Sequence, residues 1–315
     1  MNIKLLIPAL LLSLLLSACG GKQIGEGRDL SVSEDNTREE PVLLTVDGRP
    51  VPAWRYRYWL TYACTRLQEQ YEAAGMEVDW GAAADGGTLA DYVKGRALAD
   101  TVLYATVENW VERWGGSAPE DGGEQASALP ELGFDPAQIE ELQAVGRQYA
   151  ALCELACTEG SELAPTPQQL AEFAEEKGIL TLDRILVTAG EDREAAKARA
   201  GELFSRLNGA AEQASAFATL AAEGDDRKGP RTVLVTELES QVGEAARVLQ
   251  EGQCSGILES QEGFSILRRL ETDLSGLGEA YFDEQLQRAA ETAEVVLGAD
   301  YEALQPEDCL TDAGD

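Results

Sequence analysis

The sequence predicts an α+β protein in which a small antiparallel sheet with packed helices is inserted in, or follows, a mostly helical region. Three observations predict this class. Apolar residues recur at helical spacing through most of residues 42–178. From residue 179 the pattern changes to β, α, α, β, α, β, β, ending near residue 271. Helical spacing then returns in parts of residues 272–315. A chain of 315 residues is long enough for about two domains.

The composition excludes several classes of function. The chain has 25 Lys and Arg against 57 Asp and Glu, a formal charge of −32, which repels phosphate backbones. We therefore expect no nucleic-acid partner. The sequence also contains no histidine, which removes histidine-activated nucleophiles, histidine acid–base catalysis and histidine-ligated zinc. We expect neither a metal site nor a cofactor.

Residues 1–18 have the features of an export signal. Lys4 precedes an apolar run that is shorter than the roughly 20 residues that span a bilayer, and the run ends in small residues. The sequence Leu16-Ser17-Ala18-Cys19 resembles the lipobox of bacterial lipoproteins. This resemblance implies cleavage before Cys19, acylation of Cys19 and anchoring in the cell membrane on its extracytoplasmic face, as in a Gram-positive-type bacterium. An ordinary secretory signal with an incidental cysteine is the less favoured alternative. Residues 19–41 lack apolar periodicity, which favours a flexible tether.

Residues 42–178 are predicted to form a helical domain that begins with a short hairpin. Alternation in 42–51 with a turn at Asp47-Gly48 predicts the hairpin, and a helix follows from about Pro52. Further helices are expected before Gly115, from Pro136 to about Cys157, and over 168–177, with a loop over 115–129. Aromatic residues in these helices are suited to cradle unfolded clients, but their spacing favours the domain's own core.

The cysteines do not indicate a redox motif. Five remain after Cys19, an odd number, so at least one stays unpaired within a monomer. Cys153 and Cys157 are one helical turn apart, whereas the usual redox spacing is Cys-x-x-Cys. We therefore expect two small buried side chains there instead of a redox pair.

Residues 179–271 are predicted to form a compact α+β domain. A strand-like run over 179–187 leads through a charged turn into a helix with an apolar face, and a second helix carries Phe217. A short strand at 232–235, a helix ending near Leu249 and a hairpin over 255–270 complete the domain. Residues 272–315 are expected to form a helical tail that packs on the N-terminal domain.

Several short segments, taken in order, resemble the parvulin class of peptidyl-prolyl isomerases. They are Asp183-Arg184-Ile185-Leu186-Val187, Phe217-Ala218-Thr219-Leu220-Ala221, Ala245-Ala246-Arg247-Val248-Leu249 and Gly263-Phe264-Ser265-Ile266-Leu267. Together with the lipobox and the helical flanks, they resemble PrsA-like foldase lipoproteins, whose N-terminal region is similar to the chaperone domain of SurA-type proteins. The resemblance implies a membrane-anchored foldase that binds unfolded or exported polypeptides, with peptidyl-prolyl cis–trans isomerase activity of the parvulin type that is weakened or lost because both family histidine positions are substituted. The alternative is a non-catalytic chaperone or envelope assembly scaffold that uses the parvulin-like domain only to bind peptides.

The resemblance also implies a site, although its chemistry differs here. The family pairs two histidines across the sheet, near a cysteine or aspartate and an apolar pocket for the proline ring. The corresponding catalytic positions in this chain are Arg184, Asp226 and Ser265, and the pocket positions are Leu238, Val242 and Pro230. Arg184 would either donate to a twisted carbonyl oxygen or pair with Asp226 and close the site. We favour the pair, because a half-buried arginine usually binds a carboxylate.

Overall fold

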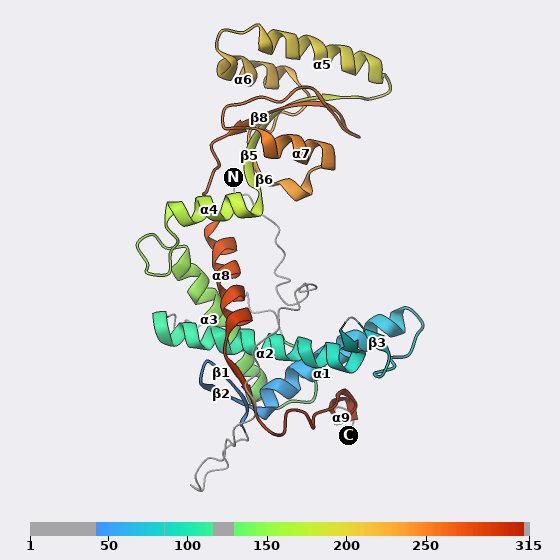
Figure 1. The fold of residues 1–315 in the computed structure, drawn as a ribbon, viewed down its shortest axis with the longest axis vertical. Coiled ribbons are helices and arrows are strands. Elements are labelled where there is room, and N and C mark those ends of the chain that lie inside the picture. The colour runs from blue at the N-terminus through green and yellow to red at the C-terminus, as the bar shows by residue number, and fades with distance from the viewer. Residues whose placement is uncertain (1–41, 85, 116–128, 312–315) are drawn as a thin grey trace. The chain divides into compact units, whose positions relative to one another are not determined.

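The computed structural model describes residues 42–84, 86–115 and 129–311 (Figure 1). The predicted export signal with Cys19, the tether over 19–41 and most of the predicted loop over 115–129 lie outside the described residues. The chain divides into two compact units. Unit 1 contains residues up to Ala164 and from Glu279 onward, and unit 2 contains Pro165–Gly278. The sequence placed these divisions at residues 179 and 271. Helix α4 (Pro167–Lys177) belongs to unit 2, because it runs through Gly178 directly into the first strand there.

Unit 1 is built mainly on long helices, two of which begin at a capping box. The helices are α1 (Ala53–Ala73), α2 (Leu89–Trp114), α3 (Pro136–Ala156), α8 (Gly278–Thr292) and the short α9 (Pro306–Thr311). Thr88 forms a capping box with Asp91 at the start of α2, and Asp135 forms one with Gln138 at the start of α3. None of the described helices is long and apolar enough to cross a membrane.

The predicted aromatic core of unit 1 is confirmed. Tyr56, Tyr58 and Trp59 of α1 are fully buried. The Trp59 ring lies 4.6 Å from that of Tyr104 on α2 and 5.1 Å from that of Tyr58, measured between centroids. These side chains therefore hold the helices together and are not open to a client.

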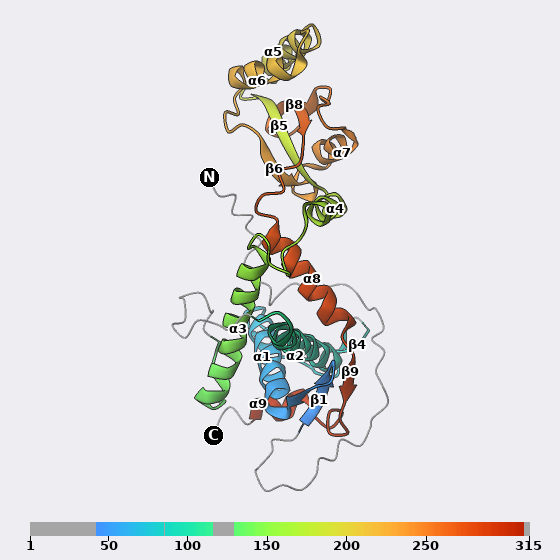
Figure 2. The ribbon, with the colours of Figure 1, turned by 90° about the vertical axis from the view of Figure 1, so that its left-hand side faces the viewer.

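A small sheet joins the two ends of unit 1. Its order is β2 (Arg49–Pro52), β1 (Val42–Val46), β9 (Val295–Leu297), all antiparallel. The predicted hairpin at Asp47-Gly48 is confirmed, and both residues have positive φ. In the tail, the helix α8 agrees with the expected helical spacing, but residues 295–297 form a strand that pairs with β1 (Figure 2). A second, two-residue hairpin of β3 (Ala83–Ala84) and β4 (Gly87–Thr88) was not predicted.

The expectation for the cysteines is wrong in one respect. Cys153 is half-buried, but Cys157 caps the end of α3 and is exposed, so the two are not a buried pair. Among the described residues, none of the five cysteines forms a disulfide; they are Cys64, Cys153, Cys157, Cys254 and Cys309.

Unit 2 contains a four-stranded antiparallel sheet in the order β6-β5-β8-β7. The strands are β5 (Ile179–Thr188), β6 (Arg231–Leu234), β7 (Leu258–Glu259) and β8 (Gly263–Leu270). Besides α4, the helices are α5 (Arg193–Asn208), α6 (Gln213–Glu223) and α7 (Ser240–Val248), with a single 3-10 turn, η1 (Val235–Glu237), after β6. The predicted order of elements is confirmed.

The two faces of this sheet are covered differently (Figure 1). Helices α5 and α6 pack on one face, where Phe217 and Leu207 meet Ile185 and Ile266. Helix α7 packs on the other face, where Ala246 and Leu249 meet residues such as Leu182. Alternation along β5 assigns its odd-numbered residues to the first face and its even-numbered residues to the second.

The burial of Phe217 gives a test of the unit 2 core. We expect Phe217→Ala to lower the free energy of unfolding of unit 2 by about 3–5 kcal/mol, because the ring leaves a cavity. Urea denaturation followed by circular dichroism measures the change. Tryptophan fluorescence should report an unchanged unit 1, because Trp54, Trp59, Trp80, Trp110 and Trp114 all lie there.

The matched control is Val248→Ala, since Val248 is in the same unit but its side chain is 78% exposed. Its effect should stay within about 0.5 kcal/mol. Equal destabilisation by the two substitutions would contradict the assigned core.

Candidate functional site

The strand register of unit 2 brings Arg184 and Ser265 to the same face of the sheet. Leu186 on β5 pairs with Ser265 on β8, and Arg184 pairs with Leu267. Because paired residues share a face and side chains alternate along a strand, Arg184 and Ser265 lie diagonally on the face that α7 covers. Ser265 is only 2% exposed, so its hydroxyl has almost no contact with solvent.

The Arg184 guanidinium is held between two carboxylates. Its Nε and Nη2 donate to Oδ2 of Asp226 at 3.0 and 2.7 Å, and its Nη1 donates to Oε2 of Glu262 at 2.9 Å. The side chain of Asp226 is 6% exposed and that of Arg184 is 25% exposed. The favoured expectation from the sequence, a pair between Arg184 and Asp226, matches this arrangement.

Asp226 is shared between two arginines. Arg231, at the start of β6, also binds its Oδ2, and the backbone N–H of Lys228 donates to its Oδ1 at 3.1 Å. Burial alone raises the pKa of Asp226, but the hydrogen bonds from Arg184 and Lys228 and the charge of Arg231 outweigh it. The pKa therefore lies below its usual value, and the carboxylate is ionised at neutral pH.

The neighbouring Asp225 ties the turn after α6 to the end of β5. Its Oδ2 accepts from the backbone N–H and the hydroxyl of Thr188, both at 2.8 Å, and its Oδ1 accepts from Arg199 at 3.0 Å. The backbone N–H of Asp225 donates to the carbonyl of Leu186 at 2.7 Å. This anchoring fixes the turn so that Asp226 faces Arg184.

Sequence reasoning missed three members of this site: Glu262, Arg231 and Asp225. Glu262 lies in the tight turn before β8 and Arg231 opens β6, so each position follows from the sheet topology. With 57 acidic residues in the chain, no local pattern marks Glu262 as a partner of Arg184.

The predicted pocket residues are only partly brought together. Leu238 and Val242 are partly buried and pack on the cluster of Leu180, Leu182 and Leu267 under α7. Pro230 is exposed in the turn before β6 and is not part of that cluster. The expectation that Pro230 contributes to an apolar pocket with them is therefore not met.

The cluster around Asp226 offers no acid–base pair. Arg184 already donates from all three guanidinium nitrogens, and Asp226 is neutralised by two arginines. Within residues 42–84, 86–115 and 129–311, no group of three or more Cys, Asp or Glu side chains is arranged to hold a metal ion.

Unit 2 is similar to a known family of domains. Residues 180–271 match the family model of the rotamase domain, described as the PPIC-type PPIASE domain. The match covers the sheet and the helices α5, α6 and α7 of unit 2 and no part of unit 1. The predicted resemblance of this segment to the parvulin class is thereby confirmed.

Over most of its length, the chain is similar to solved structures of foldases and chaperones. PrsA from Bacillus subtilis is 16% identical, with 81% of each chain covered and a TM-score of 0.26. The foldase protein PrsA from Streptococcus pneumoniae is 16% identical, with 79% of this chain and 87% of that chain covered and a TM-score of 0.27. A SurA-like chaperone of Campylobacter jejuni is 10% identical, with 82% and 99% covered and a TM-score of 0.23. No curated protein matches the sequence.

Removing the charge of Asp226 tests the cluster. We expect Asp226→Asn to lower the free energy of unfolding at pH 7 by about 2 kcal/mol. This is less than the roughly 3–5 kcal/mol for a fully buried pair, because Arg184 and Arg231 stay partly exposed. The folded-state pKa lies below the unfolded value of about 3.9. The stabilisation is therefore complete above that pH and is lost as the pH falls through the folded-state pKa.

Urea denaturation at pH 7 and pH 3 measures the difference between variant and parent, which should shrink in acid. Glu259→Gln, which removes an exposed ion pair with Arg193, is the control and should cost less than about 1 kcal/mol. A difference between Asp226→Asn and the parent that is the same at both pH values would rule out an ionised Asp226 as its cause.

Proposed function

We propose that the protein is a membrane-anchored extracytoplasmic chaperone of the foldase type, whose parvulin-like unit binds exported polypeptides without accelerating X-Pro isomerisation. The match of residues 180–271 to the PPIC-type domain supports polypeptide binding by this unit. The lipobox-like sequence ending at Cys19 supports the anchor. The names of the solved PrsA and SurA-like proteins agree with this class.

The cluster of Arg184, Arg231, Asp226 and Glu262 is the observation that supports the absence of isomerase activity. Rotation about an X-Pro bond faces a barrier of about 18–20 kcal/mol, because it breaks amide resonance. An isomerase lowers this barrier by binding the twisted amide better than the planar one in a dry pocket. Here the three guanidinium nitrogens of Arg184 bind Asp226 and Glu262, and Ser265 is buried. These bonds hold the guanidinium of Arg184 toward Asp226 and Glu262 and leave it only one N–H on Nη1 and one on Nη2, so a twisted carbonyl oxygen would have to compete with two carboxylates for this group.

A second candidate is a foldase that retains slow isomerase activity. The family match over the whole sheet favours it, as does the neighbouring placement of Leu238 and Val242 on one apolar cluster. Isomerisation needs no covalent nucleophile, so the absence of histidine does not by itself abolish it.

A protease-coupled isomerisation assay on the chain from residue 19 onward separates the two candidates. We expect the rate to equal the buffer background while aggregation of an unfolded client protein is suppressed. A rate clearly above background that disappears in Arg184→Ala, but not in the surface variant Arg193→Ala, would instead establish an arginine-based isomerase. Failure to suppress aggregation would count against both candidates.

The membrane anchor has its own test. In a bacterial host that processes lipoproteins, Cys19→Ala should abolish incorporation of a labelled fatty acid and move the protein out of the membrane fraction, because acyl chains supply the anchoring. The exposed Cys157 provides a matched control, since Cys157→Ala should change neither readout. Membrane association that survives in Cys19→Ala would refute the lipid anchor.

A further inference from the structure

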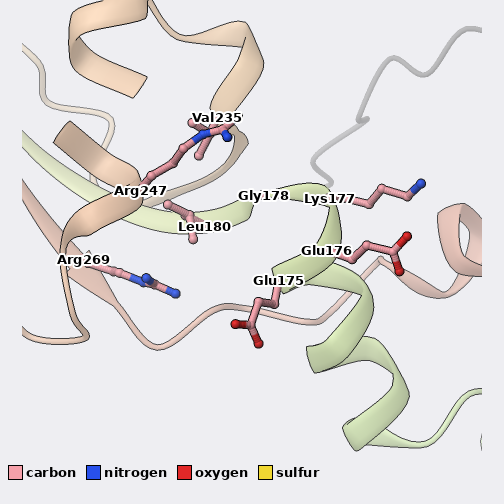
Figure 3. A pocket seen from close by; sticks show the side chains of 8 residues that line it. All are labelled: Glu175, Glu176, Lys177, Gly178, Leu180, Val235, Arg247 and Arg269. Carbon is pink, nitrogen blue, oxygen red and sulfur yellow. The ribbon is translucent and has the colours of Figure 1, made fainter. Parts of the chain in front are cut away.

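Two adjoining cavities lie beside α7 in unit 2. The first, of about 230 Å³, is lined by α4, β5, η1, α7 and β8 and has the buried Leu180 and Val235 in its wall (Figure 3). The second, of about 410 Å³, shares Val235 and Arg247 with the first and extends along α7 past Leu238. Together they are large enough for a ligand site of the usual size, about 300–1,000 Å³. None of Arg184, Asp226 and Ser265 lines either cavity.

Two arginines of this groove lack a carboxylate partner among the described residues. Most arginines in the described part of this acidic chain bind an Asp or Glu, as Arg184, Arg193 and Arg206 do. Neither Arg247 nor Arg269 is within ion-pair distance of a described carboxylate, although both line the first cavity.

Arg269 has unused hydrogen-bonding capacity. Its Nη1 donates to the carbonyl of Leu249 at 2.8 Å, but its Nε is buried without an acceptor. Its Nη2 has no acceptor among the described residues either, so a ligand oxygen beside Nη2 would add a charge-assisted hydrogen bond. Figure 3 shows Arg269 and Arg247 reaching from β8 and α7, with Leu180 of β5 between them.

The lining of the groove defines the chemistry of its ligand. Guanidinium groups recognise planar carboxylates through paired hydrogen bonds, and Leu180 and Val235 offer an apolar wall beside them. Glu175 and Glu176 of α4 line the same cavity and Glu244 of α7 lines the second, and each of these carboxylates opposes an anion there. A ligand with a carboxylate next to an apolar side chain fits this lining. An extended polypeptide with an acidic residue beside an apolar one supplies both groups.

We propose that this groove binds an acidic segment of a client polypeptide, with a carboxylate on Arg247 and Arg269 and an apolar side chain against Leu180 and Val235. The proposal rests on the proposed polypeptide-binding function but not on catalysis. Leu180 lies four residues before Arg184 on the same face of β5, roughly 13 Å away at about 3.3 Å per residue. The groove is therefore a second contact region on the sheet face that carries Arg184.

Fluorescence anisotropy with two labelled ten-residue peptides tests the groove in the chain from residue 19 onward. One peptide has a Leu-Glu-Leu centre in a Gly/Ser background, and its twin has Leu-Gln-Leu. The ionic strength is set near 0.15 M, where screening over about 8 Å limits repulsion by the chain's overall negative charge. We expect the Glu peptide to bind about tenfold more tightly, as the loss of one charge-assisted hydrogen bond implies.

Single substitutions assign the effect to the groove. Arg247→Gln and Arg269→Gln should each remove the preference for the Glu peptide, and Glu175→Gln should strengthen its binding. Arg268→Gln is the matched control, because Arg268 is the next residue on β8 and donates to the carbonyl of Ala214 on the α6 side. Arg247 lies on the exposed side of α7, so its variant remains informative if Arg269→Gln impairs folding.

Three results would overturn the proposal. The first is equal affinity for the two peptides, and the second is an equal loss of Glu-peptide affinity in Arg268→Gln and Arg269→Gln. The third is competition by inorganic phosphate that is as effective as competition by unlabelled Glu peptide, which would indicate a site for free anions. If neither peptide binds and the unfolded client still aggregates, the proposed polypeptide-binding function fails as well. Client protection with equal peptide affinities would leave that function in place and remove only the groove.

Discussion

The antiparallel pairing of β5 with β8 is the interaction on which unit 2 depends. Eight residues of each strand pair, from Thr181 with Leu270 to Thr188 with Gly263. This one register sets both faces of the sheet, because side chains alternate along each strand. A slip by one residue would move apolar side chains such as Ile266 away from α5 and α6 and turn arginines into the core. The core and the candidate sites therefore follow from the same constraint.

Arginine has two different roles on the face covered by α7. The charge of Arg184, the residue predicted to stand at a family histidine position, is balanced by Asp226 and Glu262. Asp226 also forms an ion pair with Arg231, so the two positive and two negative charges of this cluster balance each other. Arg247 and Arg269 are not balanced by described carboxylates. The same side-chain chemistry thus stabilises the fold at one position and is available to a ligand at another.

Local sequence patterns predicted the elements of unit 2 well, because their determinants lie within a few residues. Thr166 and Pro167 start α4, Gly178 ends it in a left-handed conformation, and alternation marks β5. The pairing of Arg184 with Asp226 followed from the family resemblance together with the tendency of half-buried arginines to find a carboxylate.

The remaining features depend on contacts between distant residues. The strand β9 has only three residues and pairs with a strand about 250 positions earlier, so its sequence looks like part of a helical tail. Glu262 and Arg231 reach the Asp226 cluster only through the sheet topology. Pro230, predicted to line the pocket, lies in the turn between α6 and β6, and the structure leaves it exposed.

The pairing of β1 with β9 makes unit 2 an insertion between two parts of unit 1. A chain synthesised from its N-terminus presents all of unit 2 before residues 295–297 exist, so unit 2 can complete its sheet first. During that interval one edge of β1 has open backbone donors and acceptors, which can pair with strands of other chains. A newly synthesised chain is therefore prone to aggregate through β1 until β9 has been made and has paired with it.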